Sequence, residues 1–512
     1  MPDQPAEFFI IPDLIREHAK TEAGKIAVVH DDVSLSYMAL DQQVNQVAAA
    51  LQQAGIKLGD SIAICGVNSV PYVVLFLGAL RAGIAPALIA PSSTGKAIAK
   101  MTKNSGASLL FLDHNLSGSV SPHLDPSVKI ISLETAQFEK WYASAPARPM
   151  AVTIEPDLPF NIIYSSGTTG EPKGIVQSHG MRHAHIERAG VVFGYDRSSV
   201  TMIATPLYSN TTLVSFLPAI ALGGTIVITG KFDAVKYVQL ASKYRATHAM
   251  LVPVQYKRIM DYENFDNYDL DSFVVKFCTS APFSAALKAD IVKRWPGGLV
   301  EFYGMTEGGG TCILAAHLFP NKLHTVGTPA EDHDIRLVDD AGNEVAQGEL
   351  GEVVGRSSAM MKGYHGQPDK TRESEWYDPS GLRFIRTGDI GVFDEDGFLT
   401  LMDRKKDMII SGGFNIYPSD LEIELMKHIA VADVAVIGVP SEDWGETPVA
   451  VVVLAKGSKM EGDVLKSWFA GRVGKTQRLD DVVFTDALPR SAIGKVLKRE
   501  LRDDYIRNSR QP

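Results

Sequence analysis

The chain has 512 residues, which is more than a single hydrophobic core usually serves, so we expect at least two domains. Apolar residues make up 45% of the chain and charged residues 21%, a balance typical of a soluble globular protein. The formal net charge of −10 argues against a large basic face, so no nucleic-acid partner is expected.

The first regular element that the sequence predicts is a helix that begins after Ser36 and ends before Gly55. Its apolar positions recur every three or four residues, as one face of a helix requires, and Ser36 can cap its first turn. These positions are Leu40, Val44, Val47 and Leu51. A short apolar strand, Ser61–Cys65, and a second helix, Pro71–Ala82, are predicted to follow.

Further strand-like runs alternate with helical stretches along the chain. Each run is short, rich in apolar residues and bounded by turn formers. They are Ser108–Leu112, Thr225–Ile228, His248–Val252 and Phe273–Cys278. This alternation predicts an α/β fold with parallel or mixed sheets. A charged cluster, Asp403–Asp407, then precedes about a hundred residues of different texture. We therefore place a large N-terminal domain over residues 1–402.

The cysteines and the N-terminal residues bear on the cellular location. Cys65, Cys278 and Cys312 form no CxxC pair and have no histidine at metal-ligand spacing, so a reducing compartment is favoured. The first residues lack the charged and apolar regions of a signal peptide, and no apolar run approaches membrane-spanning length. We expect a cytoplasmic protein with no membrane span.

The most informative stretch runs from Tyr164 to Gly174 and follows an apolar, strand-like run. Its glycines let backbone N–H groups turn toward an anion, its hydroxyls add donors and Lys173 adds positive charge, as a polyphosphate site requires. The flanking Pro172 and Gly174 oppose a following helix, so this is not a Walker A loop. We predict an ATP site here, formed by Ser165, Ser166, Gly167, Thr168, Thr169, Gly170 and Lys173.

This loop and four further motifs, in this order, resemble those of the adenylate-forming superfamily of acyl-CoA synthetases, luciferases and nonribosomal-peptide adenylation domains. The other motifs are Tyr303–Glu307, Thr387–Asp389, Asp403–Pro418 and Gly494–Lys495. The resemblance covers nearly the whole chain. Within the superfamily, the chain resembles bacterial aryl- or medium-chain-acid CoA ligases. It implies a large N-terminal domain of packed α/β sheets with a distorted barrel, and a small, mobile α+β C-terminal domain over residues 407–512.

The resemblance also implies the reaction. A carboxylic acid and ATP would give an acyl-adenylate and pyrophosphate, and CoA would then displace AMP to form a thioester. Tyr303 and Gly304 would contact adenine, and Thr306 would bind phosphate. Glu307 supplies an oxygen ligand of the kind that Mg²⁺ prefers. Asp389 and Arg404 would hold the ribose, since an ionised carboxylate only accepts hydrogen bonds.

Lys495 resembles the family's catalytic lysine, which neutralises charge as the carboxylate approaches the α-phosphate. The hinge implied by the resemblance covers residues 403–406, with Lys406 at the pivot, and would let the small domain serve both half-reactions. Gly412 and Gly413 resemble glycines beside the CoA pantetheine, although a tight turn would use the same residues. Lys475 and Arg478 are candidates for the CoA phosphates or are surface charges.

The acyl pocket implied by the resemblance has small side chains, which leave room for an aromatic, alicyclic or medium-chain acid. Its candidate residues are Tyr208, Ser209, Thr279, Ser280, Ala281, Gly308, Gly309 and Gly310. Ser209 departs from the histidine that many relatives have, and Gly474–Arg478 departs from their Tyr-Lys-x-Pro. The sequence therefore leaves undecided how the acyl pocket is gated and which residues contact the CoA adenine.

Two other functions remain possible. An adenylation enzyme could pass its acyl group to a carrier protein or an amine, or a non-catalytic relative could only bind acyl or nucleotide ligands. One regulatory hypothesis concerns the Pro-x4-Gly-Lys segment from Pro489 to Lys495, which looks like the site where bacterial relatives are acetylated. A lysine acetyltransferase and deacetylase would then be partners of a monomer or homodimer.

Overall fold

The computed structural model describes residues 8–165, 172–411, 414–441, 444–474, 477–491 and 494–509. The chain divides into two compact units. The first comprises Met1–His324, Pro329–Asp334 and Gly355–Ile385, and the second comprises Thr325–Thr328, Ile335–Val354 and Arg386–Pro512. The domain boundary after residue 402 and the hinge at residues 403–406 stay predictions.

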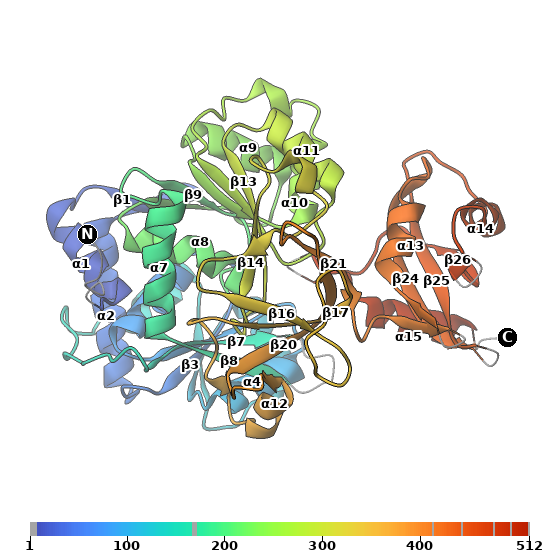
Figure 1. Ribbon diagram of the computed structural model, residues 1–512. Coiled ribbons are helices and arrows are strands. Elements are labelled where there is room, and N and C mark those ends of the chain that lie inside the picture. Colours follow the sequence, from blue (N-terminus) through green and yellow to red (C-terminus); the bar gives the residue numbers. More distant parts are fainter. Residues whose placement is uncertain are drawn as a thin grey trace. The chain divides into compact units, whose positions relative to one another are not determined.

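A seven-stranded sheet in the first unit carries the predicted ATP loop (Figure 1). Its strand order is β18-β8-β7-β4-β3-β5-β6. The five strands from β7 to β6 in this order are parallel, whereas β8 is antiparallel to β7. The bounds are β3 Ser61–Cys65, β4 Ala85–Ile89, β5 Leu109–Leu112, β6 Lys129–Ser132, β7 Pro159–Ser165, β8 Lys173–Ser178 and β18 Gly363–Tyr364. The carboxyl ends of the parallel strands therefore share one edge, where ligands of α/β sheets usually bind.

A nine-stranded sheet, with the order β15-β14-β13-β12-β11-β9-β10-β1-β2, carries the second motif. Its bounds are β1 Ile26–His30, β2 Val33–Ser36, β9 Val200–Ile203, β10 Thr225–Ile228, β11 His248–Leu251, β12 Val275–Cys278, β13 Gly298–Gly304, β14 Thr311–Ala315 and β15 Thr328–Pro329. β13 runs parallel to β12 and forms an antiparallel pair with β14. The Tyr303–Glu307 motif thus begins in a strand and continues into the connection to β14.

Helices accompany these sheets, and α2 and α3 pack against each other. In α2, Ser36 accepts a hydrogen bond from Ala39 N–H as predicted, and all four apolar positions of the predicted face are fully buried. Gly78 of α3 lets α2 approach closely, because a Cβ there would lie 2.6 Å from Val47 Cγ1. The helices of the first unit are α1 Ile11–Thr21, α2 Tyr37–Gln53, α3 Val70–Arg81, α4 Gly95–Ser105, α5 Ser117–Val120, α6 Thr135–Tyr142, α7 His179–Phe193, α8 Asn210–Ala221, α9 Ala234–Lys243, α10 Pro253–Met260, α11 Ala285–Arg294 and α12 Pro368–Glu373.

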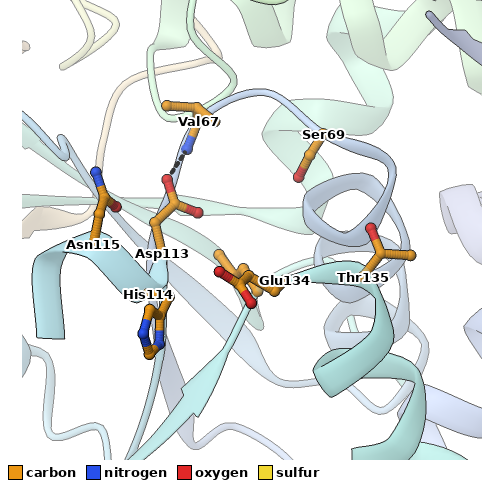
Figure 2. A pocket seen from close by; sticks show the side chains of 8 residues that line it. Val67, Ser69, Asp113, His114, Asn115, Glu134 and Thr135 are labelled. Atoms are coloured by element: carbon orange, nitrogen blue, oxygen red, sulfur yellow. Dashed lines mark hydrogen bonds between the residues drawn. The ribbon is translucent and has the colours of Figure 1, made fainter.

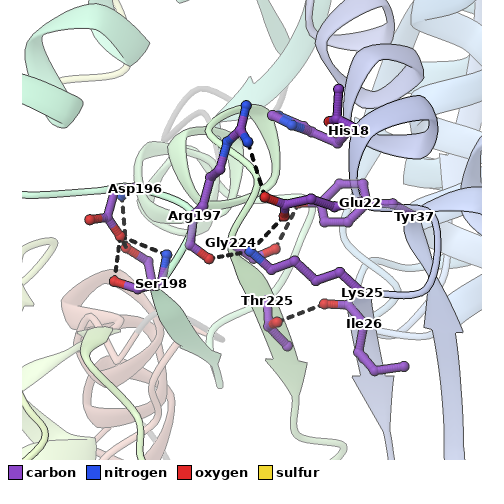
Figure 3. Close-up of polar contacts among 12 residues, drawn as sticks. His18, Glu22, Lys25, Ile26, Tyr37, Asp196, Arg197, Ser198, Gly224 and Thr225 are labelled. Carbon is purple, nitrogen blue, oxygen red and sulfur yellow. Dashed lines mark hydrogen bonds and ion pairs between the residues drawn. The ribbon is translucent and has the colours of Figure 1, made fainter.

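Polar contacts join α1 to the nine-stranded sheet (Figure 3). Glu22, just after α1, pairs with Arg197 at 3.0 Å and with Lys25 at 3.3 Å. The Tyr37 hydroxyl donates to Gly224 O at 2.7 Å, and the Thr225 hydroxyl donates to Ile26 O at 2.6 Å. These bonds satisfy polar groups at the edge of the core and therefore fix the N-terminal segment on the first unit.

The second unit contains most of the remaining strands. One group consists of β16 Asp334–Val338, β17 Gly351–Arg356, β20 Arg383–Phe393 and β21 Leu399–Arg404, and β19 Glu375–Tyr377 pairs with the first residues of β20. The C-terminal sheet, orange to red in Figure 1, has the order β23-β22-β25-β24 with β26 beside β25. Its elements are β22 Ile409–Ser411, β23 Phe414–Ile416, α13 Pro418–Leu425, β24 Val431–Ser441, β25 Gly445–Leu454, α14 Gly462–Ala470, β26 Asp481–Phe484 and α15 Lys498–Ser509.

The structure confirms the predicted α/β class, with a larger N-terminal and a smaller C-terminal part. The predicted strand Ser61–Cys65 is β3, and the other predicted strands agree with observed ones to within two residues at either end. Closure of strands into a distorted barrel stays a prediction. In the part of the chain that the structure describes, no helix is both long and apolar enough to cross a bilayer.

Candidate active site

The predicted ATP loop joins β7 to β8. Ser166, Gly167, Thr168, Thr169 and Gly170 lie outside the described residues, and only the backbone of Ser165 is described. Ser165 is paired with Lys173 in the antiparallel ladder, so the two ends of the loop lie side by side at the carboxyl end of β7. Tyr164, just before the loop, donates its hydroxyl to Met101 O at 2.9 Å and thereby fixes β7 against α4.

Glu307, the predicted metal ligand, is buried, with 9% of its surface exposed. The Tyr364 hydroxyl donates a hydrogen bond to Glu307 Oε1 at 2.9 Å. The ring of Tyr364 also lies under the Lys173 ammonium, with 4.9 Å between Nζ and the ring centroid. Burial, and then Glu307, raise the pKa of Tyr364, so the phenol stays protonated and donates. The structure therefore joins Lys173 and Glu307 through a tyrosine that sequence reasoning missed.

The glycines after Glu307 are held by close backbone contacts. Gly308 has a φ of +75°, and a Cβ there would lie 1.9 Å from Ala359 O. A Cβ on Gly309 would lie 2.9 Å from Ile385 Cβ, and Gly310 has a φ of +91°. Packing and backbone conformation thus require small residues at these positions. Their place in an acyl pocket stays a prediction.

Thr306 is held through its backbone by a buried polar network. Gln177 of β8 donates from Nε2 to Thr306 O at 3.0 Å. Arg182 of α7 donates to Gln177 Oε1 and, at 2.8 Å, to Asn210 Oδ1. Full burial lowers the pKa of Arg182 to about 9. Within the described part of the chain, Arg182 therefore donates its hydrogen bonds to amide oxygens. Sequence reasoning missed this network, because its members are far apart along the chain.

The other acyl-pocket candidates gather at the N-terminus of α8. Ser209 caps this helix by accepting from Thr211 N–H at 3.3 Å. The Thr211 hydroxyl lies 2.6 Å from the Ser280 hydroxyl, which stands between Thr279 and Ala281. Ser280 has a φ of +83°, an unusual conformation for a residue with a side chain. Burial raises the pKa of Tyr208 to about 12. The structure thus brings Ser209 and Ser280 together through Thr211.

The predicted ribose residues face each other in the second unit. Asp389 of β20 is paired with Arg404 of β21, and Arg404 Nε lies 3.3 Å from Asp389 Oδ1. The Thr387 hydroxyl accepts from Asp389 N–H at 3.0 Å and donates to Val353 O at 2.9 Å. The Thr387–Asp389 motif is therefore anchored to β17, with the carboxylate of Asp389 held beside a guanidinium.

Lys495 belongs to the same unit. Its N–H donates to Ser491 Oγ at 3.2 Å, and its carbonyl accepts from Ser491 N–H at 2.8 Å. Arg490 spans this turn by donating to Gly494 O at 2.8 Å and to Asp433 Oδ2 at 2.7 Å. Burial lowers the pKa of Lys495 to about 8, and the positive charges of Arg404 and Lys406 add to this effect. Asp389 opposes it, so Lys495 lies within electrostatic range of both predicted ribose residues.

The predicted CoA residues are described only in part. Gly412, Gly413 and Lys475 lie outside the described residues, and Arg478 is exposed. Lys406, the predicted pivot, follows Lys405, which pairs with Asp340 at 2.7 Å. The structure therefore describes all four residues of the predicted hinge segment, 403–406, but leaves its role and the CoA assignments as predictions.

A hollow of about 390 Å³ lies at the carboxyl ends of β3, β5 and β6, and β4 separates these strands from β7 in the strand order (Figure 2). Asp113 accepts from Val67 N–H there at 2.8 Å, and desolvation raises the pKa of its carboxyl group. The residues that line this hollow are Val67, Ser69, Asp113, His114, Asn115, Leu133, Glu134 and Thr135. None of them belongs to the predicted site.

Comparison with known proteins agrees with this arrangement. The AMP-binding enzyme family matches residues 15–365, and the AMP-binding enzyme C-terminal domain matches residues 420–495. The chain is 32% identical to a feruloyl-CoA synthase of Amycolatopsis sp, over 94% of this chain and 96% of that protein. It is 31% identical to 4-coumarate–CoA ligase 2 of Nicotiana tabacum, over 91% of this chain and 89% of the relative.

Among solved structures, ATP-bound MatB from Rhodopseudomonas palustris matches with a TM-score of 0.88 and 26% identity, over 97% of this chain and 99% of that chain. The two family matches cover most of the described residues of both units and include Glu307 and Lys495. The chain is therefore a member of the AMP-binding enzyme family, which confirms the resemblance seen in its motifs.

Proposed function

We propose that this chain is an ATP-dependent acid–CoA ligase whose substrate is an aromatic acid of the hydroxycinnamate class. The adenylation step is supported by one observation above all: Lys495 lies within electrostatic range of the Asp389–Arg404 pair. The aromatic substrate is supported by two relatives that span nearly the whole chain and are a feruloyl-CoA synthase and a 4-coumarate–CoA ligase. These names narrow the acids that the sequence alone leaves open.

The proposed reaction has two steps. A carboxylate oxygen of the acid attacks the α-phosphorus of ATP, the bond to the β-phosphate breaks, and pyrophosphate leaves. The CoA sulfur, after losing its proton, then attacks the carbonyl carbon of the acyl-adenylate, and AMP leaves. A free carboxylate resists attack by a thiol, so the first step supplies the leaving group that the second step needs.

Residues of the first unit would bind the nucleotide. The loop from Ser165 to Gly170 and Lys173 would hold the phosphates, Tyr303 and Gly304 the adenine, and Thr306 a phosphate oxygen. Glu307 fits a role as a Mg²⁺ ligand, because its buried carboxylate has one oxygen fixed by Tyr364, and Mg²⁺ in nucleotide sites is usually held by one or two carboxylates with the phosphates. When bound, Mg²⁺ would neutralise phosphate charge.

Residues of the second unit would complete adenylation. Asp389 would accept hydrogen bonds from the ribose hydroxyls, with Arg404 beside it. The Lys495 ammonium would offset the negative charge that builds up as the carboxylate approaches the α-phosphate. For the thioester step we propose a rotation about residues 403–406 at Lys406, after which Gly412 and Gly413 would flank pantetheine and Lys475 and Arg478 would meet the CoA phosphates. The proposed acyl pocket comprises Tyr208, Ser209, Thr279, Ser280, Ala281 and Gly308 to Gly310.

The proposed location of the protein is the cytoplasm.

The proposed regulation is acetylation of Lys495. Acetylation would remove the charge that the first step needs. The variant Lys495→Gln should therefore lose adenylation, while thioester formation from synthetic acyl-adenylate should suffer less. Full adenylation by Lys495→Gln would end the regulatory proposal.

The proposed ligase is tested with ATP, Mg²⁺ and a panel of hydroxycinnamates, benzoates, alicyclic acids and fatty acids. We expect AMP release that depends on both a hydroxycinnamate and CoA. It should be lost in Lys495→Ala and kept in Lys459→Ala, which changes an exposed lysine of the same unit. Adenylate formation without CoA dependence would favour transfer to a carrier protein or an amine. Absence of ATP–pyrophosphate exchange with every acid would favour a non-catalytic relative.

A further inference from the structure

The Tyr364 side chain contacts two residues to which the proposed function gives separate tasks. Its hydroxyl donates to Glu307 Oε1 at 2.9 Å, and its ring centroid lies 4.9 Å from Lys173 Nζ. We propose that Tyr364 is a positioning residue that orients the Glu307 carboxylate toward Mg²⁺ and holds the Lys173 ammonium for the phosphates of ATP. This inference rests on the proposed function, because it assumes that Glu307 and Lys173 meet MgATP.

The backbone around Tyr364 is fixed to the end of the ATP loop. Tyr364 lies in β18, opposite Ile175 of β8. The next residue, His365, donates its N–H to Gly174 O at 2.7 Å, and Gln367 donates from Nε2 to Pro172 O at 2.9 Å. These bonds attach the tyrosine to the strand end that carries Lys173. A shift of this strand end would therefore be transmitted to Tyr364 and to Glu307.

Further contacts reduce the freedom of the side chains themselves. Tyr364 is 7% exposed, and its N–H donates to Thr371 Oγ1 at 3.0 Å. Glu307 is fixed through its carbonyl, which accepts from Met361 N–H at 2.8 Å. The Tyr364 hydroxyl on Oε1 restricts rotation of the carboxylate, and among the described residues it leaves Oε2 for a cation. Removal of a residue that hydrogen-bonds to a metal ligand commonly lowers the metal affinity by about 10- to 100-fold.

Two substitutions separate the two tasks. Tyr364→Phe removes the hydroxyl that bonds Glu307 but keeps an aromatic face under Lys173. Tyr364→Leu removes both. The matched control is Tyr377→Phe, since Tyr377 also donates its hydroxyl to a glutamate, Glu375, at 3.0 Å but is 54% exposed. Thr371→Val provides a milder change, because it removes the acceptor of Tyr364 N–H and leaves the tyrosine and glutamate intact.

The direct measurement is the affinity for Mn²⁺, determined by electron paramagnetic resonance. It is made in the presence of α,β-methylene ATP, an analogue whose α–β linkage adenylation cannot cleave. We expect the Kd for Mn²⁺ to rise about tenfold in Tyr364→Phe and by a smaller factor in Thr371→Val, with Tyr377→Phe like the wild type. Calorimetry of metal-free ATP should show no change for Tyr364→Phe and weaker binding for Tyr364→Leu. The Mg²⁺ concentration for half-maximal ATP–pyrophosphate exchange should follow the Mn²⁺ values.

A double-mutant cycle distinguishes a residue that orients Glu307 from one that only supports the fold. In a Glu307→Gln background, Tyr364→Phe should produce little further loss of Mn²⁺ affinity, because the carboxylate that it orients is gone. Wild-type Mn²⁺ affinity in folded Tyr364→Phe, or equal losses in both backgrounds, would overturn the assignment. If the wild type itself shows no acid-dependent exchange, the proposed function fails instead, so the two failures are distinct.

Discussion

Asp389 and Arg404 face each other across the β20–β21 ladder, and 3.3 Å separates Arg404 Nε from Asp389 Oδ1. Asp389 is the less exposed partner, with 17% of its side chain accessible against 38% for Arg404. The Thr387 hydroxyl accepts from Asp389 N–H and so fixes the backbone at Asp389. The pair therefore holds a carboxylate in one orientation within reach of solvent, as a ribose site requires.

Asp389→Asn should weaken ATP binding. The amide keeps the shape of the side chain but loses the charge that pairs with Arg404 and that, in the proposed function, attracts the ribose hydroxyls. We expect the KM for ATP to rise about 10- to 100-fold, since a hydrogen bond to a charged group contributes roughly 1.5–3 kcal/mol. ATP–pyrophosphate exchange measures this value. Asp269→Asn, which breaks an exposed pair with Arg245 at 3.3 Å in the first unit, is the control and should leave the KM unchanged.

Adenylation should decline as pH rises through the pKa of Lys495, which burial lowers to about 8. In the proposed function adenylation needs the protonated ammonium of Lys495, and the protonated fraction falls about tenfold per pH unit above the pKa. The kcat/KM for ATP–pyrophosphate exchange should thus show an alkaline limb with its midpoint near this value. Bound ATP would raise the pKa of Lys495 again, so the limb for kcat should lie at higher pH.

Lys495→Arg supplies the control for this pH dependence. Arginine keeps its charge throughout the accessible range, so the alkaline limb should disappear even if the overall rate is lower. An unchanged limb in Lys495→Arg would assign the titration to another group and would contradict the role given to Lys495.

The sequence predicted those elements whose signals are local. The helix after Ser36 has both its cap and its apolar face within a few residues, and the structure shows both. Strand Ser61–Cys65 is an apolar run between turn formers, and it matches β3. The family resemblance could single out the motif residues because each motif is short and contiguous, and the roles of these residues stay predictions.

Contacts across the chain were not predictable in this way. Tyr364 lies 57 residues from Glu307, and nothing next to it in the sequence indicates a glutamate partner. Arg182 would be expected on the solvent side of a helix, yet amide oxygens from β8 and α8 allow its burial. The place of Gly308 in the acyl pocket stays a prediction, and the close approach of the Ala359 carbonyl is a second reason for a glycine that the sequence did not indicate. Each of these depends on how distant segments pack.

Arg490→Ala should impair adenylation by loosening the turn that carries Lys495. The guanidinium bridges Gly494 O and Asp433 Oδ2, so its loss frees the backbone next to the lysine. We expect the rate of ATP–pyrophosphate exchange to fall roughly tenfold, because small displacements of a catalytic group cost one to two orders of magnitude. Arg507→Ala, at an exposed position on α15, should have no effect. Equal rates for both variants would show that the bridge does not position Lys495.

Gly308→Ala tests whether the glycines after Glu307 serve packing or the acyl pocket. The new Cβ would lie 1.9 Å from Ala359 O at a φ of +75°, so either the backbone must shift or this contact must break. We expect the first unit to lose at least about 2 kcal/mol of unfolding free energy, seen as a lower denaturation midpoint. Gly118→Ala, which meets nothing within 4 Å in helix α5, should be neutral or slightly stabilising. A Gly308→Ala protein with wild-type stability but altered acid preference would instead place Gly308 in the acyl pocket.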